Sequence, residues 1–562
     1  MTTKTRAKAP RPARPADLPL PPTSRSPRRP LAAVVLAAGQ GKRMRSPRAK
    51  VLHAVAGSPL VSHVLAALEP LEVSPVVVVV GHDADAVGAA VAGKAAIALQ
   101  KEQLGTGHAV LQARKALAGF DGDVLVLCGD VPLLRSETIR ELVRLHRRVG
   151  AKATVLSAIV EDPSGYGRIV RGQAEGRIRI VEDSDASEEE LHIDEINTGT
   201  YCFNAKFLFQ RLARLGRDNA QGEYYLTDLV EAAAAEDSAA CVTLEDGEEG
   251  HGVNTRADLA RIENLMQERL IGLAMDAGVT FLDPASAMLS TSTVIGQDTV
   301  IGPCVRLEGD VRIGRNCVLE GSIHLRNTVV EEGALLRWGV VADGARIGRA
   351  ARVGPFAHLR PEAQLGEEVH IGNFVEVKKA TIGARSKANH LAYIGDASVG
   401  RDVNIGAGTI TCNYDGVSKH RTVIGDRVQI GSDTQLVAPV TVGADSYVAA
   451  GSTISRDVTP GSLAFNEKPQ RERGGWVAAF RARTAAKKAS ANPPKKAAAA
   501  ATKTKPARGA ARAPAPAPTK KPSRGAAKAA APVAKKPARR AAKVATPAPT
   551  KKPTPAPKRK RR

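Results

Sequence analysis

A glycine-rich loop that carries several cations is the first segment whose residue types could do chemistry. Gly39 and Gly41 would let the backbone approach a ligand closely, and Lys42, Arg43 and Lys50 would place positive charge beside a phosphate chain. A methionine replaces the third glycine of a dinucleotide fingerprint, and no Gly-Lys-Ser/Thr sequence closes the loop as in a P-loop. The segment is therefore either a phosphate-binding loop of another kind or an ordinary strand-to-helix turn.

Asp130 is a second candidate, because an aspartate just beyond a buried strand can bind Mg²⁺. The apolar run at 124–127 leads directly into Cys128, Gly129 and Asp130. In open α/β sheets, ligands bind beyond the carboxyl ends of the strands, and Mg²⁺ prefers oxygen ligands. The alternative interpretation is an aspartate that only shapes a turn or caps a helix.

The first half of the chain predicts the sheet that these residues need. Short apolar runs at 31–38, 76–80 and 124–127 alternate with helix-like stretches at 106–118 and 136–148. This alternation is typical of an α/β fold with a doubly wound, Rossmann-like sheet.

The second half repeats an aliphatic residue at every sixth position. The first series covers 295–319, the second 323–377 and the third 424–454, and glycine follows many of these residues. This spacing is the hexapeptide repeat of a parallel β-helix, in which each side of a coil points one aliphatic side chain inward. The second series predicts that Leu335 and Val341 face inward.

A break in the repeat marks the part of the β-helix that could carry chemistry. Residues 411–421 must leave the coil as a loop, and loops on rigid scaffolds often hold functional residues. His390 lies upstream, and imidazole can accept a proton near neutral pH. Two alternatives remain at this point: His390 is an ordinary surface histidine, or the β-helix is only a scaffold.

Charge and cysteine content limit the class of protein. Residues 484–562 contain 24 Lys and Arg and no Asp or Glu, so this tail alone accounts for the net charge of +24. The six cysteines form no C-x-x-C pair, which favours reduced structural thiols over a zinc site. No signal peptide and no apolar run long enough to cross a bilayer is present, so we expect a cytoplasmic protein without membrane insertion.

A capping box at Thr255–Asp258 predicts a linker helix between the two halves, ending at Gly278. Both ends of the chain are rich in Pro, Ala, Lys and Arg, without apolar periodicity, so we expect them to be disordered. The expected parts are an N-terminal extension (1–30), an α/β domain (31–256), the linker helix (257–277), a β-helix domain (278–483) and a basic tail (484–562).

Several motifs together resemble a known bacterial family. They are LAAGQGKRM (36–44), KVLH (50–53), LQKEQLGTGHAV (99–110), GDVPLL (129–134), DPSGYGRIV (162–170), EINTG (195–199), NAQGEYYLTD (219–228) and GVN (252–254). In this order the motifs resemble the bifunctional N-acetylglucosamine-1-phosphate uridyltransferase and glucosamine-1-phosphate acetyltransferase of bacteria. The resemblance covers residues from about 31 to about 475.

The resemblance implies roles in uridylyl transfer. Mg²⁺ would be bound by Asp130 and Asn254. The residues implied to hold UTP and the N-acetylglucosamine phosphate are Leu36, Ala37, Ala38, Gly39, Arg43, Lys50, Gln100, Gly105, Thr106, Cys128, Gly129, Gly167, Glu182, Asn197 and Asn254.

The resemblance also implies roles in acetyl transfer. His390 would be the general base that frees the glucosamine amine to attack acetyl-CoA, and Glu376 would orient it. The sugar phosphate would be held by Arg360, Lys378, Tyr393 and Asn404, and the acetyl-CoA region would be lined by Ala407, Asn413, Tyr414, Ser432 and Ala450. Glu467 departs from the family, in which a basic residue there can contact coenzyme A.

For the whole protein, the resemblance implies a left-handed β-helix, a homotrimer and a product that feeds peptidoglycan and lipopolysaccharide synthesis. One rival is a pyrophosphorylase with a purely structural β-helix, which His390, Lys378 and the 411–421 loop argue against. The other rival is a nucleic-acid-binding protein. The basic tail predicts weak, salt-dependent binding to nucleic acid or another polyanion, without base-specific contacts because the tail has no aromatic residue.

Overall fold

The computed structural model describes residues 29–172, 177–467 and 469–491. The chain divides into two compact units, one up to Pro469 and one from Gln470. Most of the two tails for which we expected disorder, residues 1–28 and 492–562, lies outside the described residues.

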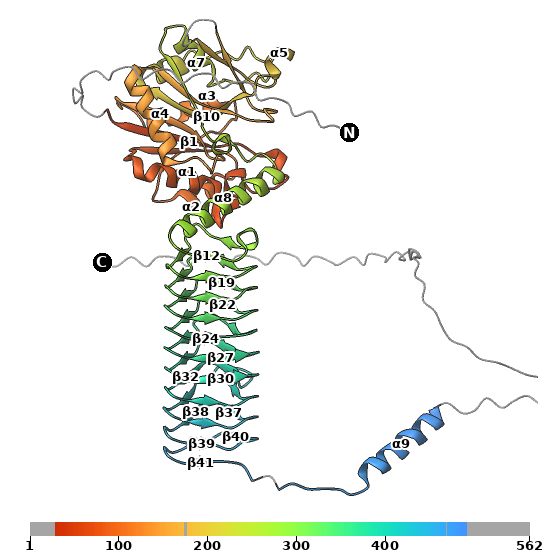
Figure 1. Ribbon diagram of the computed structural model, residues 1–562. Coiled ribbons are helices and arrows are strands. Elements are labelled where there is room, and N and C mark those ends of the chain that lie inside the picture. The colour runs from red at the N-terminus through yellow and green to blue at the C-terminus, as the bar shows by residue number, and fades with distance from the viewer. Residues whose placement is uncertain (1–28, 173–176, 468, 492–562) are drawn as a thin grey trace, which may run out of the picture. The chain divides into compact units, whose positions relative to one another are not determined.

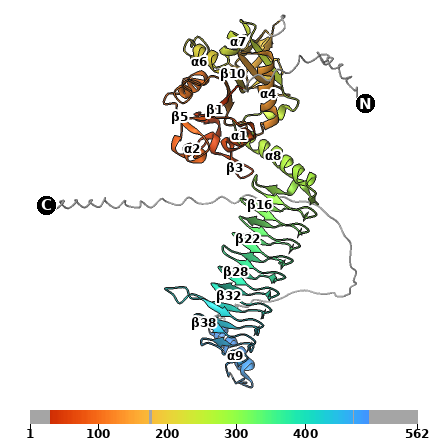
Figure 2. The same ribbon diagram turned by 90° about the vertical axis from the view of Figure 1, so that its left-hand side faces the viewer.

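The N-terminal half contains a nine-stranded mixed sheet (Figures 1 and 2). Its strands are β1 (Leu31–Ala37), β4 (Val76–Val80), β5 (Ala96–Leu99), β6 (Asp123–Cys128), β7 (Ala153–Ile159), β8 (Arg168–Arg171), β9 (Ile178–Val181), β10 (Glu195–Asn204) and β11 (Ala239–Thr243). Seven of them follow the order β11-β7-β10-β6-β1-β4-β5, while β8 pairs with β10 and β9. The strands β6, β1, β4 and β5 are parallel, and β10 is antiparallel to its neighbours. The predicted strands are confirmed.

Helices cover both faces of this sheet. They are α1 (Leu60–Leu68), α2 (Ala84–Val91), α3 (Thr106–Gln112), α4 (Ser136–Val149), α6 (Ala205–Leu212) and α7 (Asp228–Ala234). Successive residues of a strand point to opposite faces, so Val34 packs with α3, α6 and α7, whereas Val35 packs with α1, α2 and α4. The doubly wound fold is confirmed, although α3 ends earlier than the predicted 106–118 stretch and continues as a short 3₁₀ turn.

The linker helix α8 (Arg256–Asp276) begins at the predicted capping box. The Asp258 N–H donates to the Thr255 hydroxyl at 3.1 Å, and the Thr255 N–H donates to the Asp258 carboxylate at 2.7 Å. Near its start, Ile262 and Met266 pack in one cluster with Met44 of the glycine-rich loop, whereas Ile271 belongs to the β-helix core. The helix is thus packed against both halves.

The second half is a left-handed parallel β-helix with three faces. One sheet runs from β12 (Thr280–Phe281) to β41 (Leu463–Ala464), the second from β13 (Met288–Leu289) to β40 (Thr453–Ile454), and the third from β14 (Val294–Ile295) to β38 (Val440–Val442). The aliphatic side chains of successive coils stack inside as one continuous core.

The structure corrects part of the predicted repeat. In the second series, Val329, Leu335 and Val341 do not point inward. The inward positions belong instead to the next residue in each case, Val330, Leu336 and Ala342. The reason is that several coils contain 17 residues rather than 18, as the pairing of Ile313 with Val330 shows. Because two adjacent apolar residues stand at these positions, the buried residue and the one before it both fit a six-residue spacing in the sequence.

This register can be tested by two neighbouring leucines. Leu336 is fully buried in the β-helix core, whereas Leu335 is only half-buried. We expect Leu336→Ala to lower the free energy of unfolding of the β-helix by about 2–5 kcal/mol, and Leu335→Ala to lower it by about 1 kcal/mol or less. Calorimetry of the β-helix transition measures both. An equal loss in the two variants would contradict the observed register.

The C-terminal end of the β-helix also differs from the prediction. Its last strand is β41, and residues 470 onward form a separate unit that contains helix α9 (Trp476–Ala491). The expected boundary between residues 483 and 484 is therefore wrong, because it falls inside α9. The alanines that suggested a featureless tail are also strong helix formers.

Candidate active sites

A cavity of about 280 Å³ lies where β1 and β6 end, at the edge of the sheet predicted to bind ligands. It brings together most of the residues implied to hold the nucleotide. Its lining includes Leu36, Ala37, Ala38, Gly39, Lys50, Gln100, Gly105, Thr106, Cys128 and Asp130.

Close backbone packing shapes one wall of this cavity. Gly105 has a φ of 104°, and a side chain there would approach the backbone of Tyr224 to within 2.8 Å. The Thr106 hydroxyl accepts a hydrogen bond from Leu226 N–H at 3.1 Å, which fixes the start of α3. Two polar lining residues were missed from the sequence: Gln103, whose amide donates to the Ala38 carbonyl at 2.7 Å, and Glu223. Both residues lie in motifs quoted in the sequence analysis, so the motifs included them although neither residue was assigned a role.

A second, basic pocket of about 290 Å³ is formed by the glycine-rich loop. It is lined by Gln40, Gly41, Lys42, Arg43, Lys50, Gln103 and Asn254. Gly41 has a φ of 61°, and a side chain there would lie 2.7 Å from Cβ of Lys50, so the loop requires glycine. Met44, which is 1% exposed, anchors the loop in the cluster with α8. Because Lys50 and Gln103 line both cavities, the basic pocket adjoins the first one.

Lys50, Asp130 and Asn254 meet between the two cavities. The Lys50 ammonium donates to the Asn254 amide oxygen at 3.0 Å and forms an ion pair with Asp130. The Val253 N–H donates to the Asp130 carbonyl at 2.9 Å, and this bond holds Asp130 beside the segment that carries Asn254. One cation therefore already contacts both oxygens. This donor set suits Mg²⁺, which takes few protein ligands when substrate phosphates supply the others.

The residues implied to hold the sugar also lie together. Asn197 N–H donates to the Gly167 carbonyl at 2.8 Å, and a side chain at Gly167 would lie 3.4 Å from a Glu182 oxygen. Burial raises the pKa of Glu182, although a hydrogen bond from the Thr227 hydroxyl at 3.3 Å opposes the shift. Sequence reasoning missed Thr227 and also Tyr201, whose hydroxyl accepts from the Asn197 amide at 2.8 Å.

Cys128 connects the sugar residues to the nucleotide cavity. Its thiol donates to the Gly199 carbonyl at 3.5 Å, and a side chain at Gly199 would collide with it at 2.6 Å. Burial, together with the charge of Asp130, raises the pKa of the Cys128 thiol to about 12. This shift disfavours the thiolate, so nothing around Cys128 activates it as a nucleophile.

The raised pKa of Glu182 gives a pH-dependent prediction. A carboxylate that is harder to ionise in the folded state makes the protein less stable as pH rises from its unfolded pKa through its folded pKa. We therefore expect Glu182→Gln to raise the Tm of the N-terminal half by on the order of 2–4 °C at neutral pH, and by nothing below about pH 4. Thermal unfolding across this pH range measures the effect. The exposed Glu188 provides the control, Glu188→Gln; the same Tm gain in both variants would contradict the prediction.

In the β-helix, His390 is exposed at the end of strand β30 (Lys387–His390). Its Nδ1 lies 3.2 Å from Oδ1 of Asn373, which occupies the same position one coil earlier. We expected Glu376 to orient this histidine. The structure instead pairs Glu376 with Arg360, at 2.7 Å, so the orienting contact belongs to Asn373. A separation of 17 residues does not match the six-residue repeat, so the sequence alone does not show that Asn373 and His390 are aligned on neighbouring coils.

Positive charge collects near Glu376. Lys378 follows it on strand β28 (Glu376–Lys378), and Lys419 of the 411–421 loop lies beside Lys378, which lowers the pKa of Lys378. Asn413, at the base of this loop, donates to the Tyr393 hydroxyl at 3.4 Å. Lys419 was not among the predicted residues, although the sequence placed it in the functional loop.

The remaining predicted residues are spread along the coils. Asn404 pairs with Lys387 one coil below it. Ala407 accepts from Asp433 N–H at 2.7 Å, and Ser432 accepts from Gly451 N–H at 2.8 Å, so Ala407, Ser432 and Ala450 follow one edge of successive coils. Tyr414 is 60% exposed, and its hydroxyl donates within its own loop, to the Gly416 carbonyl. The Tyr414 hydroxyl is thus engaged within its own loop, and His390 contacts Asn373 instead.

Comparisons with known proteins agree with this arrangement. Residues 33–219 match the family of MobA-like NTP transferase domains, and residues 292–322 and 421–456 match the bacterial transferase hexapeptide repeat. The "Bifunctional protein GlmU" of Pelobacter propionicus is 50% identical over 450 residues, covering 79% of this chain and 98% of that protein. The proteins of the same name from Syntrophotalea carbinolica and Geobacter metallireducens are 52% and 50% identical, covering 79% of this chain and 96% and 98% of theirs.

The fold and the two sites thus define a nucleotidyltransferase fused to a hexapeptide-repeat acyltransferase. The chain belongs to the family of bifunctional GlmU proteins. It is an enzyme of UDP-N-acetylglucosamine biosynthesis that acts both as a uridyltransferase and as an acetyltransferase.

Proposed function

We propose that His390 begins the sequence of reactions by accepting a proton from the amine of glucosamine 1-phosphate. The observation that carries this proposal is the contact between His390 Nδ1 and the Asn373 amide oxygen. An oxygen accepts only from a protonated nitrogen, so this contact leaves the lone pair on Nε2. The freed amine attacks the carbonyl carbon of acetyl-CoA, the bond from that carbon to sulfur breaks, and coenzyme A leaves as the thiol.

Arg360, Lys378 and Lys419 would hold the phosphate of this substrate, with Tyr393 and Asn404 beside them. Lys419 close to Lys378 leaves two like charges facing each other, which lowers the pKa of Lys378. A phosphate dianion between them would relieve this repulsion. Acetyl-CoA would extend along Ala407, Ser432 and Ala450, and Asn413 and Tyr414 would complete its site.

We propose that uridylyl transfer follows in the N-terminal half. Leu36–Gly39, Gln100, Gly105, Thr106, Cys128 and Gly129 would hold the uridine nucleotide, while Gly167, Glu182 and Asn197 would hold N-acetylglucosamine 1-phosphate. Arg43 and Lys50 would neutralise the phosphates of UTP as charge develops on the leaving pyrophosphate. The sugar phosphate oxygen is already ionised, so positioning does most of the work and no protein nucleophile is needed.

Asp130 and Asn254 would bind Mg²⁺, displacing Lys50 from the position between them. The metal would supply charge stabilisation to the phosphates. For the whole chain we propose a homotrimer, in which the exposed Tyr414 would serve the His390 of a neighbouring copy. We also propose that the protein acts in the cytoplasm. No described helix is long and apolar enough to cross a membrane. The basic tail at 484–562 would add weak binding to polyanions.

The acetyltransfer half of this proposal can be tested by thiol release. The full-length protein is given glucosamine 1-phosphate and acetyl-CoA without UTP, and free coenzyme A is followed with a thiol reagent. We expect release that depends on the sugar phosphate. If no coenzyme A were released, the protein would be a uridyltransferase with a structural β-helix, which is the rival function.

A further inference from the structure

The proposed Mg²⁺ ligand Asn254 ends a short segment, 252–254, whose three consecutive backbone N–H groups are each held by a different element. The Val253 N–H donates to the Asp130 carbonyl at 2.9 Å, just beyond the end of β6. The Asn254 N–H donates to the Asp258 carboxylate at 2.8 Å, in the first turn of α8. The sheet and the linker helix thus hold two of the three groups.

Tyr166 holds the third group. Its hydroxyl accepts a hydrogen bond from the Gly252 N–H at 3.2 Å and lies 3.5 Å from Nδ1 of His251. The Tyr166 and His251 rings also meet edge to face, with their centroids 5.9 Å apart and an interplanar angle of 89°. Tyr166 is therefore attached to this segment both by its hydroxyl and by its ring.

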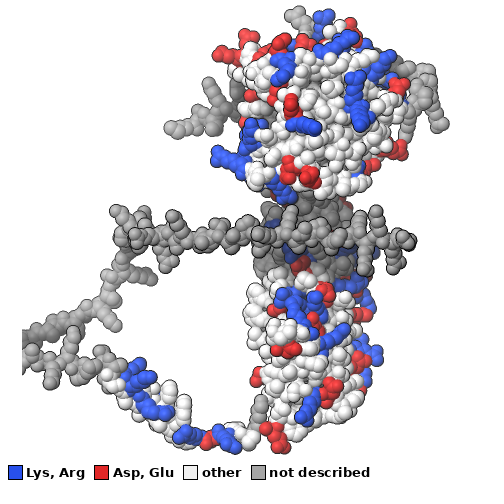
Figure 3. All heavy atoms as spheres, turned by 180° about the vertical axis from the view of Figure 1, so that it is seen from behind, with Lys and Arg blue, Asp and Glu red and all other residues white. Residues whose placement is uncertain are grey.

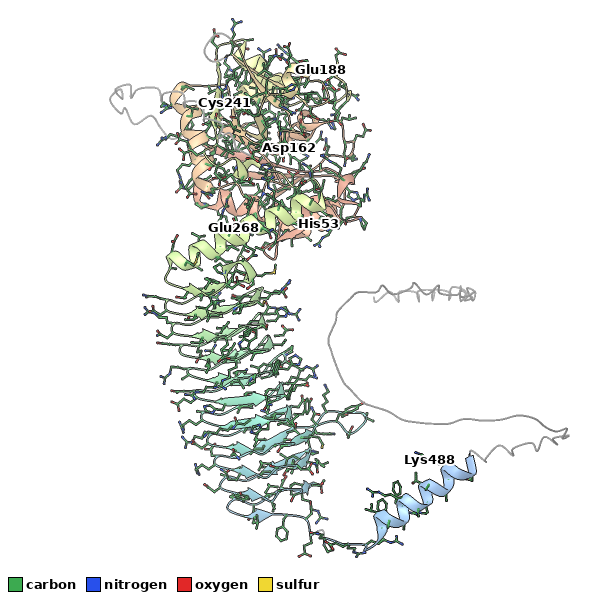
Figure 4. The ribbon with its side chains drawn as sticks, turned by 45° about the vertical axis from the view of Figure 1, so that its right-hand side comes forward. His53, Asp162, Glu188, Cys241, Glu268 and Lys488 are labelled. Carbon is green, nitrogen blue, oxygen red and sulfur yellow. The ribbon has the colours of Figure 1, made fainter. Side chains whose placement is uncertain are left out.

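Tyr166 itself comes from the sugar side of the site. It lies in the loop between β7 and β8, in which Figure 4 labels Asp162, and it directly precedes Gly167, one of the residues implied to hold the sugar. A side chain at Gly165 would lie 3.9 Å from the Arg43 guanidinium, so this loop also lies beside a residue proposed to face the UTP phosphates. Tyr166 thus connects the sugar residues to segment 252–254.

A buried cation fixes the backbone of this loop. Arg168 is only 2% exposed, and its guanidinium donates to the Tyr166 carbonyl and, at 3.2 Å, to the Asp183 carboxylate. The same Asp183 oxygen accepts a hydrogen bond from the Gly165 N–H at 3.1 Å. Because its backbone is held in this way, Tyr166 presents its hydroxyl from a fixed position.

The backbone contacts of segment 252–254 matter because the Asn254 side chain has few other restraints. It carries no charge, and Lys50, which donates to its amide oxygen, would be displaced by Mg²⁺. Lys and Arg are interspersed with Asp and Glu over the face of the N-terminal half that Figure 3 shows, so that surface provides no strong field of one sign. The three hydrogen bonds to the segment therefore decide where the amide oxygen lies.

We propose that Tyr166 is a positioning residue for uridylyl transfer. Its hydroxyl holds segment 252–254 against the sugar loop and so keeps the Asn254 amide oxygen where Mg²⁺ binds. Because Tyr166 belongs to the loop that leads into Gly167, binding of the sugar phosphate and binding of the metal strengthen each other. The inference rests on the proposed Mg²⁺ site and goes beyond it by naming the contact that couples this site to the sugar.

The variant Tyr166→Phe removes the hydroxyl and keeps the ring. Pyrophosphate release by the full-length protein is measured with saturating UTP and N-acetylglucosamine 1-phosphate while Mg²⁺ is varied, and then with saturating Mg²⁺ while the sugar phosphate is varied. We expect the Mg²⁺ concentration for half-maximal release and the KM for the sugar phosphate each to rise about fivefold, the effect of losing one hydrogen bond. The KM for UTP at saturating Mg²⁺ and the Tm should stay as in the wild type.

Ser136→Ala is the matched control, because the Ser136 hydroxyl also makes a single hydrogen bond to backbone. It donates to the Ala67 carbonyl at 2.8 Å, and Ser136 lines neither cavity. This variant should leave both constants unchanged. An unchanged Mg²⁺ dependence of Tyr166→Phe would overturn the proposal, whether or not the KM for the sugar phosphate or the Tm changes.

Asp130→Asn, measured alongside, separates this inference from the proposed function. If the Mg²⁺ dependence shifts in Asp130→Asn but not in Tyr166→Phe, the metal site stands and only the role of Tyr166 is overturned. If it shifts in neither variant, the proposed Mg²⁺ site is wrong and the inference fails with it.

Discussion

Replacing His390 with alanine is expected to lower acetyl transfer by about 10²–10⁴-fold, because a general base that removes the amine proton contributes this much to the rate. Uridylyl transfer from UTP to N-acetylglucosamine 1-phosphate should be unchanged, since the nucleotide and sugar residues all lie in the N-terminal half. Thiol release and pyrophosphate release, each measured with its own substrates, separate the two effects.

His324 provides the matched control for this variant. It is a partly exposed histidine on another coil of the same β-helix, hydrogen-bonded to Glu308 at 2.9 Å. His324→Ala should leave both reactions intact. If His390→Ala released thiol at the wild-type rate, His390 would not be the general base. It would then be the ordinary surface histidine that the sequence also allowed.

Replacing Asp130 with asparagine is expected to lower uridylyl transfer by about a hundredfold or more, because the change removes the negative charge of the proposed Mg²⁺ site. Acetyl transfer should be unchanged. The variant should also need a higher Mg²⁺ concentration for half-maximal pyrophosphate release, which an effect on folding alone would not cause.

Asp121, an exposed aspartate just before β6, is the control. Asp121→Asn should behave like the wild type in both reactions. An Asp130→Asn protein with the same Mg²⁺ dependence as the wild type would show that Asp130 only shapes its turn. In that case the ion pair between Lys50 and Asp130 would have no role in catalysis.

Much of the fold could be predicted from local patterns. The valine run of β4 and the apolar run of β6 are strands that lie fully within the sheet, so their sequences are apolar throughout. The capping box of α8 was equally clear, because Thr255 and Asp258 act on each other over three residues. In each case the signal lies within the element itself.

The errors came from places where distant residues decide the structure. Leu335 and Leu336 are equally apolar, and only stacking on the neighbouring coil selects Leu336 for the core. Glu376 lies in the expected position, but Arg360 on the preceding coil binds its carboxylate. These pairings depend on coils of 17 or 18 residues, which a six-residue pattern does not resolve.

The candidate sites follow the same division. The glycine-rich loop and Asp130 could be found because each directly follows a strand whose end defines the ligand edge of the sheet. Asn373, Gln103 and Thr227 could not be assigned, because their roles arise from contacts across 17, 65 and 45 positions of sequence. Helix α9 was hidden for another reason: its alanines and cations continue into a tail of similar composition.

Dependence of pyrophosphate release on acetyl-CoA tests the central claim, two successive reactions at two sites of one chain, most directly. Full-length protein is given glucosamine 1-phosphate, UTP and Mg²⁺, and pyrophosphate is followed before and after acetyl-CoA is added. The account predicts little release at first, then release after a lag while N-acetylglucosamine 1-phosphate accumulates, with UDP-N-acetylglucosamine as the product. Equally rapid release without acetyl-CoA, with UDP-glucosamine as the product, would contradict it.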